Sequence, residues 1–178
     1  MRLFIAIGIP DEIKGSITRI QEAIGDDFVN VRWVSKEQMH LTLKFLGEVQ
    51  DNNLISIKNN LNKIKFDRFK LCLDSIDVFP NEDYIRVLWV GLKPEDKVIN
   101  LQKSIDESLR DLFEREKNFK AHITLGRVKD ISNIQKFKGR LKKIEIGSKE
   151  FRVDSFSLVK SILTNGVVHE DLEKFCAQ

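Results

Sequence analysis

The sequence has few cysteines, few prolines and no long apolar run, and each scarcity excludes a class of protein. Cys72 and Cys176 are its only cysteines, and they lie far apart without any metal-ligand spacing. Isolated thiols of this kind predict reduced, structural cysteines, so we expect a protein of the cytoplasm. The N-terminal apolar run Leu3–Ile9 is far shorter than the about 20 residues that span a membrane. It leads directly into an amphipathic pattern, so we expect a buried strand, no signal peptide and no membrane contact.

Neither the composition nor the charge marks an unusual class. With nine glycines, three prolines and 42% hydrophobic residues, the chain of 178 residues has the composition of a globular protein and not of a disordered one. Its formal net charge of +3 suits an anionic ligand but is too small to indicate a strong nonspecific nucleic-acid binder. No low-complexity linker divides the chain. We therefore expect residues 1–178 to form one domain, which by default is a monomer.

Apolar residues recur at two spacings, which predicts strands that alternate with amphipathic helices. Helical spacing is found in Ile13, Ile17, Ile20 and Ile24, and again in Val98, Leu101, Ile105, Leu109 and Leu112. Strands are predicted at Leu3–Ile9, Val31–Val34, His40–Leu46, Lys70–Val78, Tyr84–Val90, Ala121–Leu125, Lys142–Ile146 and Phe151–Val159. This order, with hairpins between some of the strands, indicates the α+β class.

One tetrapeptide pattern, His–apolar–Thr–apolar, occurs twice. It opens HLTLKF at His40–Phe45 and HITLGR at His122–Arg127, although the chain has only three histidines and four threonines. The two copies are 122 − 40 = 82 positions apart, and each follows a predicted helix, which indicates two related lobes. A single copy would be an ordinary surface or core histidine on a strand. Two copies in one chain are a specific signal of function, whereas one copy is a weak signal.

The doubled pattern places imidazoles and hydroxyls on the same strand face. Residues i and i+2 share a face, so His40 lies beside Thr42 and His122 beside Thr124. Two imidazoles that converge supply one base and one acid, because their ordinary pKa of about 6.5 allows both forms near neutral pH. The threonine hydroxyls suit the non-bridging oxygens of a phosphate. Two histidines are too few for a zinc site, and the sequence has neither HExxH nor Gly-x-Ser-x-Gly, so we expect no metal and no cofactor.

With these motifs the chain resembles the two-histidine phosphoesterase superfamily, whose members carry twin H-x-T-x motifs. It looks most similar to the RNA 2′,3′-cyclic phosphodiesterases, historically called 2′-5′ RNA ligases, and in particular to archaeal ones. The resemblance covers nearly the whole chain, in the segments MRLFIAI, RWVSKEQMHLTLKFLGEV, VFPN, YIRVLWVGL, FKAHITLGRV and SILTNG.

The resemblance implies a fold and a reaction. The fold would have two similar lobes whose antiparallel sheets face each other across a central cleft, with the helices outside. The reaction would be metal-independent hydrolysis of a 2′,3′-cyclic phosphate at an RNA 3′ end, leaving a 2′-phosphomonoester, and also 2′-5′ ligation of tRNA halves. His40 would protonate the leaving ribose oxygen and His122 would activate water, while Thr42 and Thr124 would hold the phosphate.

Two further family positions lie three residues beyond each threonine. By the resemblance, Phe45 stacks on the terminal base and Arg127 contacts the nucleotide. Strict alternation instead puts both side chains on the core face, with Leu43 and Leu125. The carry-over therefore requires each strand to end or bulge at this point, and for Phe45 an ordinary core position is the alternative.

Two other residues invite a structural test. Lys44 shares the parity of the first motif, so it is either a cation at the rim of the cleft or a solvated lysine. Near the C-terminus the family often has Gly-x-x-Tyr, where this chain has Gly166 followed three positions later by His169. We expect His169 to be an exposed replacement and not a third catalytic residue.

Three functions remain open at this point. The first is the metal-independent phosphodiesterase acting on RNA ends. The second uses the same histidines on small cyclic nucleotides or 2′-5′ oligoadenylates. The third is a noncatalytic module that cradles the terminal phosphate of an RNA, and the intact histidines and threonines argue against it.

Overall fold

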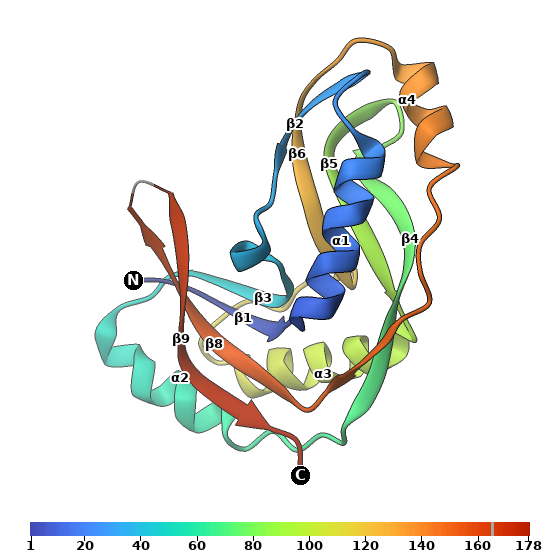
Figure 1. Ribbon diagram of the computed structural model, residues 1–178. Helices are drawn as coiled ribbons and strands as arrows, with labels where there is room; N and C mark the ends of the chain where they lie inside the picture. The colour runs from blue at the N-terminus through green and yellow to red at the C-terminus, as the bar shows by residue number, and fades with distance from the viewer. Residues whose placement is uncertain (165) are drawn as a thin grey trace.

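The computed structural model describes residues 1–164 and 166–178, which form nine strands, four α-helices and two short 3-10 helices (Figure 1). The strands are β1 (Arg2–Gly8), β2 (Val29–Trp33), β3 (His40–Glu48), β4 (Phe69–Asn81), β5 (Tyr84–Lys93), β6 (His122–Ile131), β7 (Glu150–Val153), β8 (Ser155–Leu163) and β9 (Val167–Cys176). The helices are α1 (Asp11–Ile24), α2 (Leu54–Leu61), α3 (Glu95–Ser108), α4 (Ile134–Leu141), η1 (Lys36–Gln38) and η2 (Asp51–Asn53).

The nine strands join one strongly curled sheet, in which every pairing is antiparallel (Figure 1). Its order is β7-β4-β5-β6-β3-β1-β8-β9, and β2 adds to β6. The two halves of the sheet meet where Leu41 of β3 pairs with Ile123 of β6. The predicted α+β class with two lobes of antiparallel sheet is confirmed.

Each half of the chain supplies the same succession of elements, and the halves exchange their outer strands. A strand, a helix and a motif-bearing strand occur in this order as β1-α1-β3, with β2 and η1 between α1 and β3, and again as β5-α3-β6. In both cases the first strand pairs with the motif strand. The other neighbour of β1 is β8, from the second half of the chain, and the other neighbour of β5 is β4, from the first half. Each lobe is therefore built from both halves of the sequence.

The apolar helix faces are buried as predicted, with two local differences. The face of α1 is at most 4% exposed at Ile13, Ile17, Ile20 and Ile24. Helix α3 ends at Ser108, so the last two apolar positions of the predicted helix lie beyond it. The strand predicted at Lys142–Ile146 is wrong: this segment is irregular, and Ile144 and Ile146 pack against the core from a loop.

Side-chain alternation in the first motif strand is reversed by a β-bulge. The register between β1 and β3 shifts by one residue between Thr42 and Lys44, so Leu43 is an extra residue on β3. A bulge of this kind re-aims the side chains that follow it. Lys44 is therefore only 4% exposed, whereas the next side chain, Phe45, is 68% exposed. The prediction that Lys44 is a rim cation or a solvated lysine is wrong for this reason.

The second motif strand has a bulge at the matching place. The register between β5 and β6 shifts between Thr124 and Gly126, and the shift returns Arg127 to the exposed side. A glycine is required here because β2 passes very close. A Cβ on Gly126 would lie 2.4 Å from Cγ1 of Val31 and 3.0 Å from Cε3 of Trp33.

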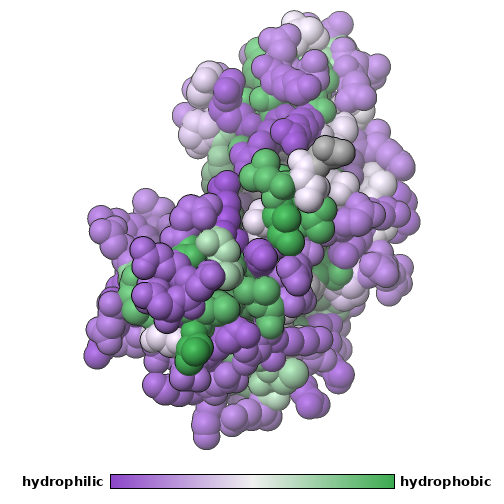
Figure 2. All heavy atoms as spheres, turned by 90° about the vertical axis from the view of Figure 1, so that its left-hand side faces the viewer, coloured by the Kyte–Doolittle hydropathy of each residue, from purple (hydrophilic) through white to green (hydrophobic). Residues whose placement is uncertain are grey.

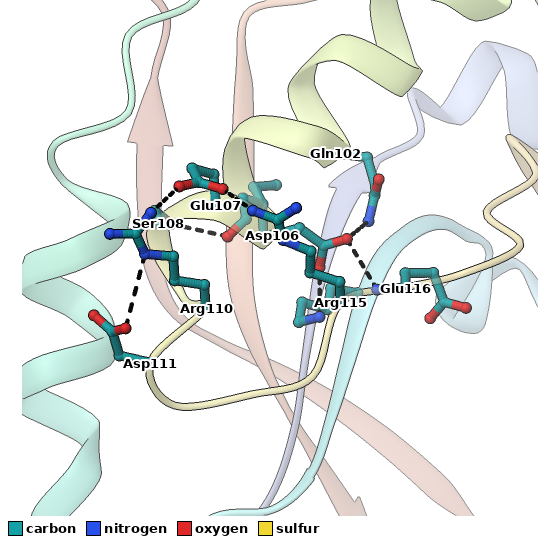
Figure 3. Close-up of polar contacts among 10 residues, drawn as sticks. Gln102, Asp106, Glu107, Ser108, Arg110, Asp111, Arg115 and Glu116 are labelled. Carbon is teal, nitrogen blue, oxygen red and sulfur yellow. Dashed lines mark hydrogen bonds and ion pairs between the residues drawn. The ribbon is translucent and has the colours of Figure 1, made fainter.

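Lys44 ends in a buried polar cluster between β3 and α3. Its Nζ donates to Oδ1 of Asp106 at 2.5 Å and to the backbone carbonyl of Glu114 at 2.6 Å. The same carboxylate accepts from Nε2 of Gln102 at 2.7 Å and from the backbone N–H of Glu116 at 3.0 Å (Figure 3). The cluster ties β3 to α3 and to the loop that leads into β6, and it gives both buried charges the partners that burial demands.

Breaking this cluster from one side is expected to destabilise the fold strongly. Asp106→Ala leaves the Lys44 ammonium buried without a carboxylate, which should lower the free energy of unfolding by about 3–5 kcal/mol. The Lys44→Met, Asp106→Leu double variant has no buried charge and should recover part of that loss. Urea denaturation of the three proteins measures both effects. A loss under about 1 kcal/mol in the single variant, the value typical of exposed pairs, would contradict the burial of the cluster.

Candidate active site

The two motifs meet on one face at the centre of the sheet, here called the motif face. Leu41 and Ile123 pair in opposite directions, so each histidine lies across from the threonine of the other strand. The four polar side chains, His40, Thr42, His122 and Thr124, are all partly exposed, whereas the apolar residues between them are fully buried. The structure thus brings together the four residues that the sequence singles out.

Both imidazoles are held in the same way. Nδ1 of His40 lies 2.7 Å from the backbone carbonyl of Gln38, and Nδ1 of His122 lies 2.7 Å from that of Lys120. A carbonyl oxygen only accepts, so Nδ1 carries the hydrogen in both rings. Nε2 is then the atom left to act on a ligand, as a base when the ring is neutral and as an acid when it is protonated.

Aromatic rings wall both imidazoles. The ring of Phe4 lies 4.8 Å from that of His40 between centroids. The rings of Phe79 and Trp89 lie 5.2 Å and 5.7 Å from that of His122, and they stack on each other at 4.8 Å. These contacts remove water from the histidines and so favour their uncharged form.

The pKa values of both histidines follow from this burial. Burial lowers the pKa of His40 to about 4, aided by repulsion from His169 and His122 and opposed by the hydrogen bond to Gln38. Burial also lowers the pKa of His122, against the hydrogen bond to Lys120. Both rings are therefore neutral in the free protein near pH 7. A phosphate bound between them would raise both pKa values, because an adjacent anion favours the imidazolium.

The third histidine belongs to the same neighbourhood. His169 on β9 is half-buried, and its ring lies edge-on to those of His40 and Phe4 at centroid distances of 5.0 Å and 4.9 Å. The expectation of an exposed replacement at this position is wrong. Sequence reasoning missed the contact because it depends on where the β8–β9 hairpin places its residues relative to β1.

The two bulges bring the remaining predicted residues to the motif face. Phe45 lies beyond His40 and Thr42 on β3, with its ring 6.2 Å from that of Phe4. Arg127 takes the corresponding place on β6 and is exposed. To take the roles that the resemblance gives them, Phe45 and Arg127 each need a bulge in their strand. Both bulges are present. The space-filling view shows the side on which the two lobes separate, where apolar side chains gather between hydrophilic ones (Figure 2).

The described residues also bear on metal binding and on membrane insertion. Residues 1–164 and 166–178 contain no group of three or more histidine, cysteine and carboxylate side chains placed to hold a metal ion. Cys72 and Cys176 are free thiols. In the same ranges no helix is long and apolar enough to cross a bilayer.

The family follows from comparison with known proteins. The sequence model of the LigT-like phosphoesterases matches the chain twice in succession, over residues 7–89 and 90–169. The chain belongs to the LigT-like phosphoesterase family. Each of the two matches contains one of the two motifs, so the family pattern repeats with the same period as the strand–helix–strand units.

Curated relatives and solved structures agree with this assignment. The RNA 2′,3′-cyclic phosphodiesterase of Methanocaldococcus jannaschii is 39% identical over 98% of this chain and 100% of its own. That of Archaeoglobus fulgidus is 36% identical over 98% of this chain and 99% of its own. The crystal structure of E. coli LigT with 3′-AMP, at 26% identity, superposes with a TM-score of 0.78 over 99% of this chain and 98% of that one. The resemblance inferred from the motifs is confirmed.

The aromatic walls of the site could not be read from the sequence. Phe79 and Trp89 lie on β4 and β5, and they reach His122 because β4 pairs with β5 and β5 pairs with β6. Trp89 faces Thr124 across the β5–β6 ladder. The segment Tyr84–Val90 predicts a strand, but the sequence holds no signal for the register that brings Trp89 to the site.

His40 is expected to make folding depend on pH. Its folded pKa of about 4 lies below the value of about 6.5 in the unfolded chain, so between these pH values the unfolded chain binds more protons. Stability that is present above pH 6.5 is therefore lost as the pH falls toward 4, by at most about 3 kcal/mol. Urea denaturation of wild type and His40→Asn at pH 4, 5, 6 and 7 isolates the effect, since the other groups cancel in the difference. A difference that stays constant with pH would show that the imidazole is solvated.

Proposed function

We propose that the protein hydrolyses the 2′,3′-cyclic phosphate at an RNA 3′ end to a 2′-phosphomonoester, with His40 and His122 as acid and base. The observation that carries the proposal is the matched anchoring of the two rings, which leaves both Nε2 atoms for a substrate. The relatives named RNA 2′,3′-cyclic phosphodiesterase support the substrate class. The E. coli LigT structure with 3′-AMP supports a ribonucleotide as the ligand.

In the proposed step, a water oxygen bonds to phosphorus while the bond from phosphorus to O3′ breaks. Neutral Nε2 of His122 takes a proton from the water, and protonated Nε2 of His40 gives its proton to O3′. The hydroxyls of Thr42 and Thr124 donate to the non-bridging oxygens, whose charge grows in the transition state. The net change is the addition of one water to the cyclic ester, without a metal. His122 then holds a proton and His40 lacks one, so solvent exchange restores the pair.

The residues beyond the bulges would hold the nucleotide. Phe45 offers an exposed ring on which the terminal base can stack, a contact that tolerates any base. Arg127 offers a guanidinium from the other lobe. With the phosphate between the two histidines, the terminal nucleotide would thus be contacted from both motif strands.

The proposed arrangement of the site also permits ligation. If a 5′-hydroxyl replaced the attacking water, its oxygen would bond to phosphorus as the bond to O3′ breaks, which gives a 2′-5′ linkage, so the proposal includes the joining of RNA ends such as tRNA halves. We also propose that residues 1–178 form one bilobal domain, because each lobe contains strands from both halves of the chain. A monomer is the default oligomeric state of the proposal.

Hydrolysis is tested on a short RNA that ends in a 2′,3′-cyclic phosphate, in excess EDTA. Wild type should add one water and leave the phosphate on O2′, as mass spectrometry and nuclease mapping would show. His40→Ala and His122→Ala should each lower the rate at least about 100-fold, the usual contribution of a general acid or base. Binding of the RNA without turnover by wild type would contradict the proposal and favour a phosphate-binding module. Turnover confined to small cyclic nucleotides or 2′-5′ oligoadenylates would move the function to those substrates.

The rate should peak on the acid side of neutrality. One ring must be protonated and the other neutral, and burial places the pKa values of both below 6.5 in the free protein. The maximum of kcat/KM, which reports the free enzyme, should therefore lie below about pH 6.5 and fall on both sides. Initial rates from pH 4 to 8 check this with a substrate whose phosphodiester does not titrate in that range. A maximum above pH 7 would contradict the lowered pKa values.

A further inference from the structure

Arg32 stands directly opposite Arg127. The two residues are cross-strand partners in the β2–β6 ladder, and both are exposed. Within residues 1–164 and 166–178 neither guanidinium forms an ion pair or a side-chain hydrogen bond with another residue. Sequence reasoning passed over Arg32 because nothing in the sequence pairs it with a residue 95 positions away (127 − 32).

The face on which Arg32 lies follows from Gly126. A Cβ on that glycine would point at the side chains of Val31 and Trp33. Both of these side chains pack against the core, so they lie on the core side of β2. Alternation along the strand then turns Arg32 to the opposite side, the motif face. Its cross-strand partner Arg127 lies on that same face, beyond Thr124.

Two like charges placed directly opposite each other in an antiparallel pair oppose folding. Here nothing in the described structure neutralises them, so the arrangement points to an anion supplied from outside. Two guanidinium groups can offer a phosphate several donors at once, and Arg keeps its charge at all relevant pH values. From Thr124, Arg127 is about two strand positions away, or about 7 Å, so these charges lie beside the catalytic phosphate site and not on it.

We propose that Arg32 and Arg127 together clamp the phosphodiester on the 5′ side of the terminal nucleotide. Arg32 is then a specificity-determining residue that makes the protein prefer an oligonucleotide end to a lone nucleoside 2′,3′-cyclic phosphate. This inference rests on the proposed function, since it assumes that the terminal cyclic phosphate sits between the two motifs. The competing explanation is that Arg32 only protects the exposed edge strand β2 from pairing with another chain.

Two substrates that differ by one phosphodiester test the proposal. They are adenosine 2′,3′-cyclic phosphate, which has no 5′ phosphate, and a dinucleotide that ends in the same cyclic phosphate. Arg32→Gln should lower kcat/KM for the dinucleotide about tenfold and leave that for the mononucleotide unchanged. The fall of log kcat/KM with log salt should also become shallower for the dinucleotide, because one charged contact with its phosphodiester is lost.

The matched control is Arg152→Gln. Arg152 is an exposed arginine on the edge strand β7 and stands opposite another cation, Lys70, far along the sheet from the motifs. Arg152→Gln should leave kcat/KM unchanged for both the dinucleotide and the mononucleotide. Arg32→Lys, which keeps the charge but not the fork of donors, should fall between wild type and Arg32→Gln on the dinucleotide.

Each outcome decides the question. If Arg32→Gln lowers kcat/KM equally for both substrates, or for neither, the clamp is overturned. In the second case, protection of the edge strand remains as the role of Arg32. If wild type turns over neither substrate, the proposed function fails, and binding still tests the clamp. A labelled tetranucleotide with a 2′-phosphate should then bind wild type more tightly than Arg32→Gln, while adenosine 2′-phosphate competes equally with both. Denaturation midpoints should show Arg32→Gln as stable as wild type or more stable, because the repulsion is gone.

Discussion

The site depends on one backbone pairing, that of Leu41 with Ile123 at the centre of the sheet. This pairing joins the two lobes and sets the two motif strands side by side in opposite directions. Because side chains alternate, the core residues of both motifs point to one face and the histidines and threonines to the other. Leu41–Ile123 is the one ladder pair between β3 and β6 in residues 1–164 and 166–178, and a slip of one residue there would turn the imidazole of the shifted strand into the core.

The bulge that follows each motif is supported differently in the two lobes. In the first lobe the residue after the inserted one is Lys44, whose charge is accommodated by Asp106 and the carbonyl of Glu114. In the second lobe it is Gly126, and the vacant space is taken by the side chains of β2. The backbone feature is the same, but only the second lobe gains an added strand on this side, and that strand carries Arg32 to the motif face.

The sequence predicts most of the helices and strands and which of their faces are buried, but it does not predict how the strands pair. Spacing alone identified the buried face of α1 and the shared face of His40 and Thr42, because both depend on local geometry. The resemblance required a bulge before Phe45 could reach the site, yet no residue type marks it. The burial of Lys44 depends on a carboxylate 62 positions away, and the contact of His169 depends on a hairpin from the far end of the chain. Such features are set by strand pairing, which periodicity does not specify.

The placement of charge around the imidazoles follows from the same bulge. A cation beside two buried histidines would lower their pKa values further and make the acid harder to protonate. Continued alternation would have put the ammonium of Lys44 in that position, two residues from Thr42. The bulge instead sends Lys44 into the polar cluster under β3 and brings the uncharged ring of Phe45 to the motif face. The arginines stay farther along the strands, where they can attract a phosphate chain at a distance from the rings that must exchange protons. The residue inserted in β3 thus keeps the ammonium of Lys44 away from the two imidazoles.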